Sequence, residues 1–250
     1  MDLEQYRQAD SEKERLQDLL RLLPQGKQSL LEIGARDGYH SRLLTGHFET
    51  VTALDLEKPD FTIDRVVPVR GDVTDLQFPD NHFDCVLCAE VLEHIPAVEK
   101  AASEISRVAR GEVIIGVPYR QDIRCAKLTC RACGKVNPPF GHVNTFDEER
   151  LRALFPRLRV AEFSFAGTNY LRTNAFSSWL MTAGGNPWGT YFQDEPCIHC
   201  GARLEAPASR SLAQKISAAL AYRIDRWQRF FTKPIPAWIH VLFQKGSPAA

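Results

Sequence analysis

The order of apolar and polar stretches constrains the fold of this chain more than any other feature of its sequence. Short apolar runs recur along the first half of the chain, and segments of helical periodicity separate them. Strands that alternate with helices in this way indicate a parallel β-sheet with helices on both faces. We therefore predict an α/β fold. The predicted strands of the first half are 30–33, 51–54, 66–69, 83–88 and 113–117.

The remaining segments extend this pattern at both ends. Residues 3–23 predict an amphipathic helix, and residues 158–165 and 237–243 predict two later strands. Residues 118–145 and 184–209 are rich in glycine and proline, which indicates loops. Further helices are predicted at 146–155, 169–182 and 211–232.

Charge balance and apolar content exclude several classes of protein. The chain has 250 residues, with 31 Lys and Arg against 31 Asp and Glu, and 44% of its residues are apolar. Such a chain can build one sizeable core, so disorder, a collagen helix and a coiled coil are excluded. A net charge of zero provides no general attraction to nucleic acid, and we expect no nucleic-acid partner. No apolar stretch approaches the length of about 18 residues that spans a membrane.

Seven cysteines, an odd number, and a charged N-terminal start indicate a reducing compartment, so we expect a cytoplasmic protein. Two Cys-x-x-Cys-Gly segments contain Cys130, Cys133, Cys197 and Cys200. Four thiolates form the tetrahedral set that zinc prefers, and they leave no position for water. We therefore predict a structural zinc ion. The 63 residues between Cys133 and Cys197 are too many for a compact zinc ribbon, so two separate insertions must supply the ligands.

The other cysteines and two histidines are weaker candidates as ligands. Cys125, His142 and His199 could each replace one thiolate of the set. Cys85 and Cys88 also resemble a metal-binding pair, but both lie in a predicted strand. Residues three apart in a strand point to opposite faces, so we expect these two thiols in the core.

The first predicted strand runs into a glycine-containing turn with Glu32, Gly34 and Gly38, where backbone amides can approach a ligand. A dinucleotide-binding fingerprint needs further glycines at the positions that Arg36 and Tyr39 occupy. The spacing therefore argues against a nicotinamide-dependent dehydrogenase. The segment instead resembles motif I of the class I S-adenosylmethionine-dependent methyltransferases, with Arg36 in place of the middle glycine. That change could narrow the space beside the methionine part of the cofactor or place a cation near its carboxylate.

The ends of the next two strands carry groups that this resemblance implies. Asp55, followed by Leu56, closes the second strand, where a carboxylate can accept hydrogen bonds from both ribose hydroxyls. Asp72 and Val73 follow the third strand and resemble the adenine-contacting turn of the family. Either aspartate taken alone would be read as a turn residue. Their joint placement favours a cofactor site.

Residues 78–96 resemble motif IV and its flank in the methyltransferase type 11 group, which is related to the ubiquinone and menaquinone biosynthesis enzymes. In that group, the strand end that corresponds to Ala89 and Glu90 lines the methionine and sulfonium region. The resemblance covers roughly residues 28–120. It implies a Rossmann-like fold with a seven-stranded, mainly parallel sheet, and S-adenosylmethionine as cofactor.

The domain organisation follows from these assignments. We predict an N-terminal helix at residues 1–28 and a methyltransferase domain at residues 29–250. Zinc-binding insertions are predicted at about 120–145 and 184–209. Nothing in the sequence points to one oligomeric state.

The predicted reaction transfers a methyl group to an oxygen or nitrogen atom of a small-molecule or glycan-like acceptor. His142 lies in a segment that resembles the histidine-bearing segment after the fifth strand in this family, and it could be a general base or a structural histidine. His94, at the end of the motif IV flank, could face the substrate or begin a helix. In-line approach of the acceptor and exclusion of water can carry most of the rate without either histidine.

The C-terminal helix combines an apolar stripe with positive charge. From Pro207 to Lys245 there are seven Lys and Arg against one acid, Asp225. The simpler expectation is that the stripe covers the sheet. The alternative is a weak contact with a membrane surface.

Two other functions fit the same residues. A noncatalytic, zinc-stabilised binding module with a vestigial cofactor pocket would explain Arg36 in the glycine loop. A zinc-bearing RNA methyltransferase is disfavoured by the neutral net charge, although the basic C-terminal segment keeps it as an alternative.

Overall fold

The chain divides into two compact units, and the computed structural model describes residues 7–246. The sheet unit is made of Asp10–Tyr119, Phe146–Gly167 and the segment that starts at Ala237. The insertion unit is made mainly of Arg120–Thr145 and Thr168–Pro236. The chain therefore leaves the sheet unit twice and returns to it twice.

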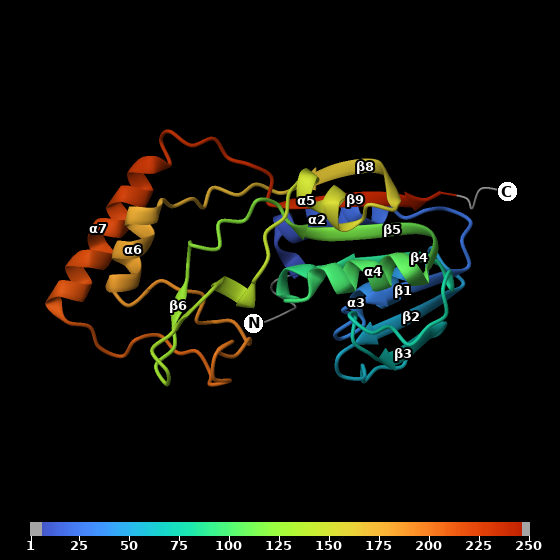
Figure 1. The fold of residues 1–250 in the computed structure, drawn as a ribbon, viewed down its shortest axis with the longest axis horizontal. Coiled ribbons are helices and arrows are strands. Elements are labelled where there is room, and N and C mark those ends of the chain that lie inside the picture. The colour runs from blue at the N-terminus through green and yellow to red at the C-terminus, as the bar shows by residue number, and fades with distance from the viewer. Residues whose placement is uncertain (1–6, 247–250) are drawn as a thin grey trace. The chain divides into compact units, whose positions relative to one another are not determined.

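A seven-stranded sheet forms the centre of the sheet unit (Figure 1), with the strand order β3-β2-β1-β4-β5-β9-β8. The first five strands of this order are parallel, whereas β9 runs antiparallel to both β5 and β8. The predicted seven-stranded, mainly parallel sheet is thus confirmed. The strands are β1 (Ser29–Ile33), β2 (Thr50–Asp55), β3 (Val66–Arg70), β4 (Phe83–Ala89), β5 (Ala109–Pro118), β8 (Leu158–Ala166) and β9 (Trp238–Lys245).

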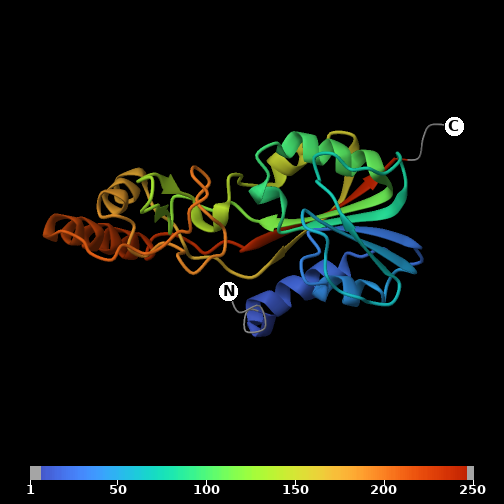
Figure 2. The ribbon, with the colours of Figure 1, turned by 90° about the horizontal axis from the view of Figure 1, so that it is seen from below.

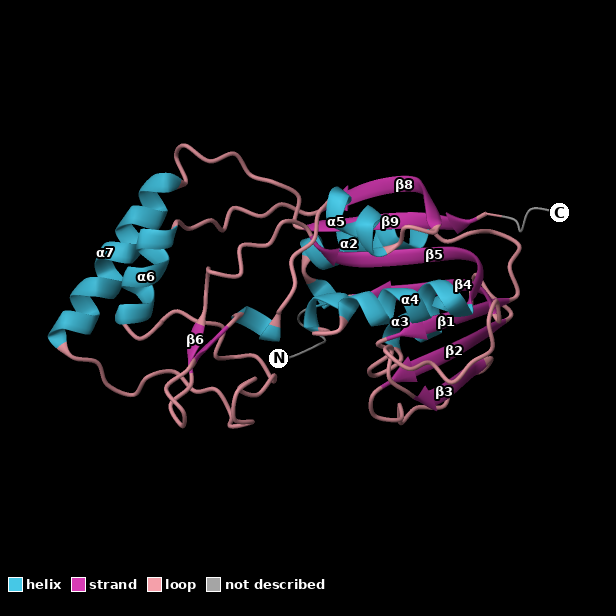
Figure 3. Cartoon of the chain, viewed as in Figure 1, coloured by secondary structure: helices cyan, strands magenta, loops and turns pink. Residues whose placement is uncertain are grey.

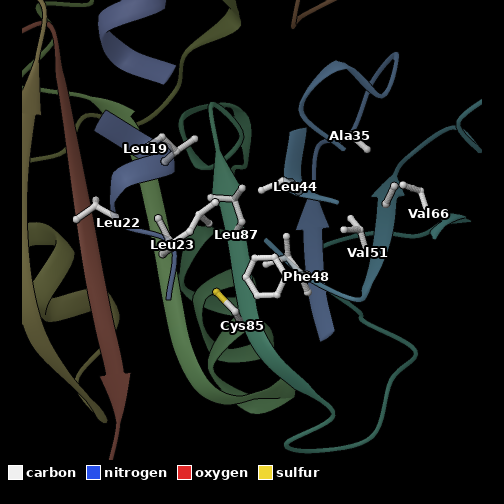
Figure 4. Packing of buried hydrophobic residues seen from close by; sticks show 13 residues of the cluster. Leu19, Leu22, Leu23, Ala35, Leu44, Phe48, Val51, Val66, Cys85 and Leu87 are labelled. Carbon is white, nitrogen blue, oxygen red and sulfur yellow. The ribbon is translucent and has the colours of Figure 1, made fainter. Parts of the chain in front are cut away.

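Helices α2 and α3 pack on one face of the sheet (Figure 4). Leu19 of α2 and Leu44 of α3 join a buried cluster with Val51, Cys85 and Leu87 of the strands. The structure has a helix within the predicted span of 3–23, but α2 is shorter than predicted, and residues 3–6 lie outside the described range. The helix bounds are α2 (Asp10–Arg21) and α3 (Tyr39–Leu44).

Helices α4 (Val98–Val108) and α5 (Glu148–Leu154) contact each other and cover the opposite face of the sheet (Figure 2). The buried residues of α4 follow the three- and four-residue spacing of an amphipathic helix, which explains why this segment is helical and which side it buries. They are Val98, Ala101, Ala102, Ile105 and Val108.

The strand order places a ligand site at the carboxyl ends of the strands. The chain builds outward from β1 through β2 to β3, and then returns to place β4 on the other side of β1. In open parallel sheets, ligands bind beyond the strand ends at such a reversal. The loops that follow β1, β2, β3 and β4 all begin at this edge.

The insertion unit contains a small hairpin and two longer helices (Figure 3). β6 (Leu128–Thr129) pairs antiparallel with β7 (Val136–Asn137), and the one-turn helix η2 (Pro139–Gly141) follows. Helix α6 (Ala175–Ala183) packs along α7 (Leu212–Gln228). Across residues 7–246, none of the helices combines the length and the apolar character that crossing a bilayer requires.

Helix α7 does not bury the apolar stripe that the sequence shows. Its buried residues are Ala218 and Ala221, and Ser177 of α6 donates a hydrogen bond to the Ala221 carbonyl at 3.0 Å. The side chains of Leu212 and Trp227 are 75% and 64% exposed. The expectation that this stripe covers the sheet is therefore wrong. Periodicity shows which face of a helix is apolar, but it does not show what lies against that face.

Candidate cofactor site and metal centre

The turn after β1 passes very close to the end of β4. Gly34 has a φ of 85°, and a Cβ atom at this position would lie 2.5 Å from Cγ2 of Val91. Gly38, with a φ of 78°, begins α3, and a Cβ atom there would lie 2.7 Å from the ring of Phe61. Both positions need glycine because of this left-handed backbone and these close approaches. Gly34 thus lets the first loop lie directly against the end of β4, and Gly38 lets the start of α3 lie against Phe61.

Arg36 takes the backbone conformation that a glycine would take. Its φ of 47° lies in the left-handed region, and its side chain is exposed. Its backbone amide donates a hydrogen bond to Oδ2 of Asp55 at 2.8 Å. The loop therefore keeps its path, and the arginine side chain points to solvent instead of filling the loop.

Asp55 ties the ends of β1 and β2 together. Its Oδ1 accepts a hydrogen bond from the backbone amide of Leu56 at 2.7 Å, while its Oδ2 accepts from Arg36. The amide of Gly34 donates to the carbonyl of Leu54 at 2.8 Å. An ionised carboxylate has about four acceptor sites, so a half-buried Asp55 can also accept from ligand hydroxyls.

Asp72 forms a turn after β3. Its Oδ1 accepts from the backbone amide and from the hydroxyl of Thr74, both at 2.8 Å. These two hydrogen bonds hold the pKa of Asp72 below its usual value, and the bond from the Thr74 amide has the larger effect. Val73 beside it is buried. Asp72 can hold this turn and also accept a hydrogen bond from a ligand, because its contacts with Thr74 use only part of the acceptor capacity of the carboxylate.

The end of β4 is strained and polar. Glu90 follows the half-buried Ala89 and has a φ of 57°, which a residue other than glycine adopts only at a cost. Its Oε2 accepts a hydrogen bond from the indole nitrogen of Trp238 at 3.2 Å. Its Oε1 is buried without a hydrogen-bond partner among the described residues. Such strain held at a strand end is typical of ligand sites.

The two Cys-x-x-Cys-Gly segments of the insertion unit, residues 130–134 and 197–201, which we call the cysteine knuckles, share one backbone conformation. The amide of Gly134 donates to the carbonyl of Cys130 at 2.9 Å, and the amide of Gly201 donates to the carbonyl of Cys197 at 2.8 Å. Both glycines have a φ of 72°. In each knuckle, the amide of the first cysteine also donates to the carbonyl of the residue after the glycine, at 2.9 and 2.8 Å. The repeated motif in the sequence is therefore also a repeated structure.

The fold brings the four knuckle sulfurs into one cluster. The Sγ atoms of Cys130 and Cys200 are 3.7 Å apart, as are those of Cys133 and Cys197, and all four lie within 4.8 Å of one another. A tetrahedral zinc ion with bonds of about 2.3 Å would hold its sulfurs about 3.8 Å apart. A disulfide would instead need about 2.05 Å. The four thiols thus fit a zinc ion with no open coordination position.

Contacts between the knuckles support this cluster. Oδ1 of Asn137 accepts from the amide of Ile198 at 2.9 Å, and Nε2 of His199 lies 3.1 Å from the carbonyl oxygen of Val136. Leu128 and Leu204 pack against the two buried cysteines. One ring nitrogen of His199 is thus engaged with the backbone, outside the sulfur cluster.

The remaining cysteines lie apart from the sulfur cluster. Cys85 and Cys88 are fully buried on β4, and Cys85 packs on the α2 face of the sheet, as their strand position predicts. Burial raises the pKa of Cys125 to about 12, so this thiol stays protonated at neutral pH.

Comparison with known proteins assigns the family. Residues 31–115 match the model of a methyltransferase domain. The phosphatidylethanolamine N-methyltransferase of Cereibacter sphaeroides is 30% identical over 146 residues, which are 53% of this chain and 71% of that protein. The chain belongs to the class I S-adenosylmethionine-dependent methyltransferases. The sterol 24-C-methyltransferase of Yarrowia lipolytica is 43% identical to this methyltransferase over 54 residues, which are 22% of the chain and only 14% of the sterol enzyme.

A solved structure shows the same fold. The N-methyltransferase NodS from Bradyrhizobium japonicum WM9, in complex with S-adenosyl-L-homocysteine, has a TM-score of 0.53 with this methyltransferase. The match covers 97% of this chain and 91% of the NodS chain at 14% identity, so the likeness concerns the fold alone.

Glu32 is the buried acid of the methyltransferase's first motif. It lies on β1 with 3% of its surface exposed, and its Oε2 accepts a hydrogen bond from the hydroxyl of Ser41. Burial raises the pKa of Glu32 to about 7, despite the hydrogen bond from Ser41, and the charges of Asp55 and Asp37 add to this rise.

We expect Glu32→Gln to flatten the pH dependence of stability. A raised pKa means that the folded protein holds this proton more tightly than the unfolded chain. The resulting stability is fully present below the ordinary pKa of 4.5 and is lost as the pH rises to about 7. At about 1.4 kcal/mol per pKa unit, the loss is about 3 kcal/mol. Urea unfolding of the ligand-free protein at several pH values measures it.

The exposed Glu57→Gln is the matched control and should follow the parent protein. A Glu32→Gln variant that loses stability between pH 4.5 and 7 as steeply as the parent would contradict this account.

Sequence reasoning missed a buried polar group beside Glu90. Nε of Arg15 donates to Glu12 at 2.8 Å, and the Arg15 guanidinium lies 5.9 Å from the ring centre of Trp238. Both oxygens of the Glu93 carboxyl group are buried without a partner among the described residues. Burial, and then the charge of Glu90, raise the pKa of Glu93 well above its usual value. The signal in the sequence was the pair Glu12 and Arg15, which lies on the apolar side of the N-terminal helix and so predicts buried charges.

The two histidines predicted as catalytic candidates lie in different units. His94 ends η1 (Leu92–His94) in the sheet unit and is half-buried. His142 is buried in the insertion unit, where its Nδ1 lies 2.6 Å from Oε1 of Gln121. A role as general base stays a prediction for both.

Proposed function

We propose that this chain transfers the methyl group of S-adenosylmethionine to an oxygen or nitrogen atom of a small-molecule or glycan-like acceptor. One observation carries the proposal: the predicted cofactor residues, far apart in the sequence, lie at adjacent strand ends where the strand order reverses. Asp55 would accept from the ribose hydroxyls and Asp72 from the adenine amine. Ala89 and Glu90 would line the methionine end, together with the amides of the glycine loop.

When bound, S-adenosylmethionine supplies a positively charged sulfonium whose methyl carbon is open to in-line attack. The chain's own task is then to position the acceptor and to exclude water. The Cereibacter relative is named for N-methylation of phosphatidylethanolamine, which favours nitrogen as the accepting atom.

We also propose that zinc, held by Cys130, Cys133, Cys197 and Cys200, is structural and shapes the substrate side. A closed set of four thiolates leaves no place for water or substrate. Both excursions into the insertion unit leave the sheet unit at the carboxyl ends of β5 and β8, which belong to the same edge of the sheet as the predicted cofactor residues. A set of four thiolates on zinc suits a reducing compartment, which supports a cytoplasmic location.

Calorimetry and product analysis test the catalytic proposal. Titration of the zinc-loaded full chain with S-adenosylmethionine should show one site per chain. Incubation with amine and hydroxyl acceptors should then release S-adenosylhomocysteine. Absence of cofactor binding would remove the enzymatic proposal and leave the noncatalytic module. That alternative rested on Arg36, whose exposed side chain leaves the loop intact.

A further inference from the structure

Helix α7 buries its small residues and exposes its large ones. Against α6 it places Ser217, Ala218 and Ala221, and the hydroxyl of Ser217 donates to the carbonyl of Leu180 at 2.8 Å. A Cβ atom at Gly184, which caps the end of α6, would lie 2.7 Å from Cβ of Ala218, so the two helices pack very closely there. The large apolar residues of α7 therefore cannot belong to this interface.

Those large residues form one continuous stripe on the outside of α7. At 3.6 residues per turn, a spacing of four, four and seven residues keeps the four that lie on α7 on one side of the helix. Phe231 follows in the turn after α7, where its ring centre lies 4.9 Å from that of Trp227. We name the α6–α7 pair the aromatic hairpin (Figure 1). It carries two further exposed aromatic rings on α6, those of Phe176 and Trp179. The stripe consists of Leu212, Ile216, Leu220, Trp227 and Phe231, which are 45–75% exposed.

The exposed side of α7 also carries only positive charge. Residues 212–233 contain five Lys and Arg and a single acid, Asp225. Asp225 is turned inward, where its Oδ1 accepts from the hydroxyl of Thr173 at 2.9 Å and from the side chain of Gln228 at 3.1 Å. Arg223 and Arg226 are exposed beside the apolar stripe. An apolar stripe bordered by cations is the pattern of helices that lie in the surface of an anionic bilayer.

We propose that the aromatic hairpin docks this protein on anionic lipid bilayers. The aliphatic side chains of Leu212, Ile216 and Leu220 would enter the boundary between headgroups and acyl chains, where Trp227 also finds its preferred surroundings. The arginines would meet lipid phosphates. Nucleic acid would satisfy the cations but would leave the aliphatic side chains in water. Exposed apolar surface on this scale is uncommon in proteins that bind nothing there.

Sedimentation with vesicles tests this docking. The zinc-loaded full chain should bind vesicles of phosphatidylcholine with about one third phosphatidylglycerol, and raising the salt well above about 0.1 M should weaken the binding. Vesicles of phosphatidylcholine alone should bind much less. Binding should shift tryptophan fluorescence to the blue, because three of the four tryptophans lie in the insertion unit. The double substitution Trp227→Ala and Phe231→Ala should weaken binding at least about tenfold.

Matched variants separate docking from general effects. Val67→Ala removes exposed apolar surface from β3, and the charge reversals Arg42→Glu and Arg157→Glu match Arg223→Glu and Arg226→Glu. Only the α7 variants should weaken vesicle binding, while all variants keep their zinc and their circular dichroism. Equal binding to neutral and anionic vesicles, or no binding, would overturn the proposal. So would a dimer in light scattering that the α7 double substitution converts to a monomer.

Discussion

Replacing Cys197 with serine is expected to abolish zinc binding and to unfold the insertion unit. The parent protein should hold about one zinc ion per chain, and the variant should hold far less after dialysis. Structural zinc bound by small domains contributes about 10–16 kcal/mol of apparent binding free energy at neutral pH, and this binding is coupled to folding. The core around the cluster is small, with Leu128 and Leu204 beside the buried cysteines. Elemental analysis and limited proteolysis measure the two effects.

Cys125→Ser is the control for this prediction. Cys125 lies in the insertion unit but not in the sulfur cluster, so its replacement should leave one zinc ion per chain. The assignment of the four ligands fails if Cys197→Ser retains the parent's zinc. It also fails if the parent protein, purified without chelator, holds much less than one ion per chain.

Asp55→Asn is expected to weaken S-adenosylmethionine binding at least about 100-fold. A hydrogen bond to a charged acceptor contributes about 1.5–3 kcal/mol, and the carboxylate is proposed to accept two from the ribose. Asparagine keeps the shape of the side chain and one oxygen acceptor, but it brings a donor where a hydroxyl must donate. Calorimetry with the ligand-free protein measures the change.

The neighbouring Asp60→Asn serves as the control, because Asp60 is exposed after the same strand and should leave the affinity unchanged. Asp55 also accepts from the amides of Arg36 and Leu56, so the melting temperature of each variant must be compared first. An affinity within a few-fold of the parent, at unchanged stability, would place the ribose elsewhere.

Much of the sheet unit follows from local sequence patterns. Buried parallel strands produce continuous apolar runs, and the helices between them produce the three- and four-residue spacing seen in α4. The motif residues Glu32, Asp55 and Asp72 stand at strand ends, so topology alone brings them to one edge. The cysteine knuckles are equally local, because a glycine with positive φ is needed wherever a loop curls around sulfur.

Other features depend on contacts between distant segments. The buried guanidinium of Arg15 lies against the ring of Trp238, which comes more than 200 residues later in the chain. Position 34 needs glycine because Val91 lies too close for a Cβ atom. The left-handed backbone of Glu90 is held by the hydrogen bond that its amide donates to the carbonyl of Gly116. None of these contacts leaves a periodic signal in the sequence.

The sequence by itself determined the alternation of strands and helices, the strand-end motifs and the four cysteines that we propose as zinc ligands, because each depends on neighbouring residues. Only the tertiary structure decided where the C-terminal helix goes. An apolar stripe at helical spacing has the same pattern whether a sheet, a membrane or another chain covers it. The small residues on the other side of α7 settle the packing, because they alone allow α6 to approach so closely. The large residues are left facing outward for that reason.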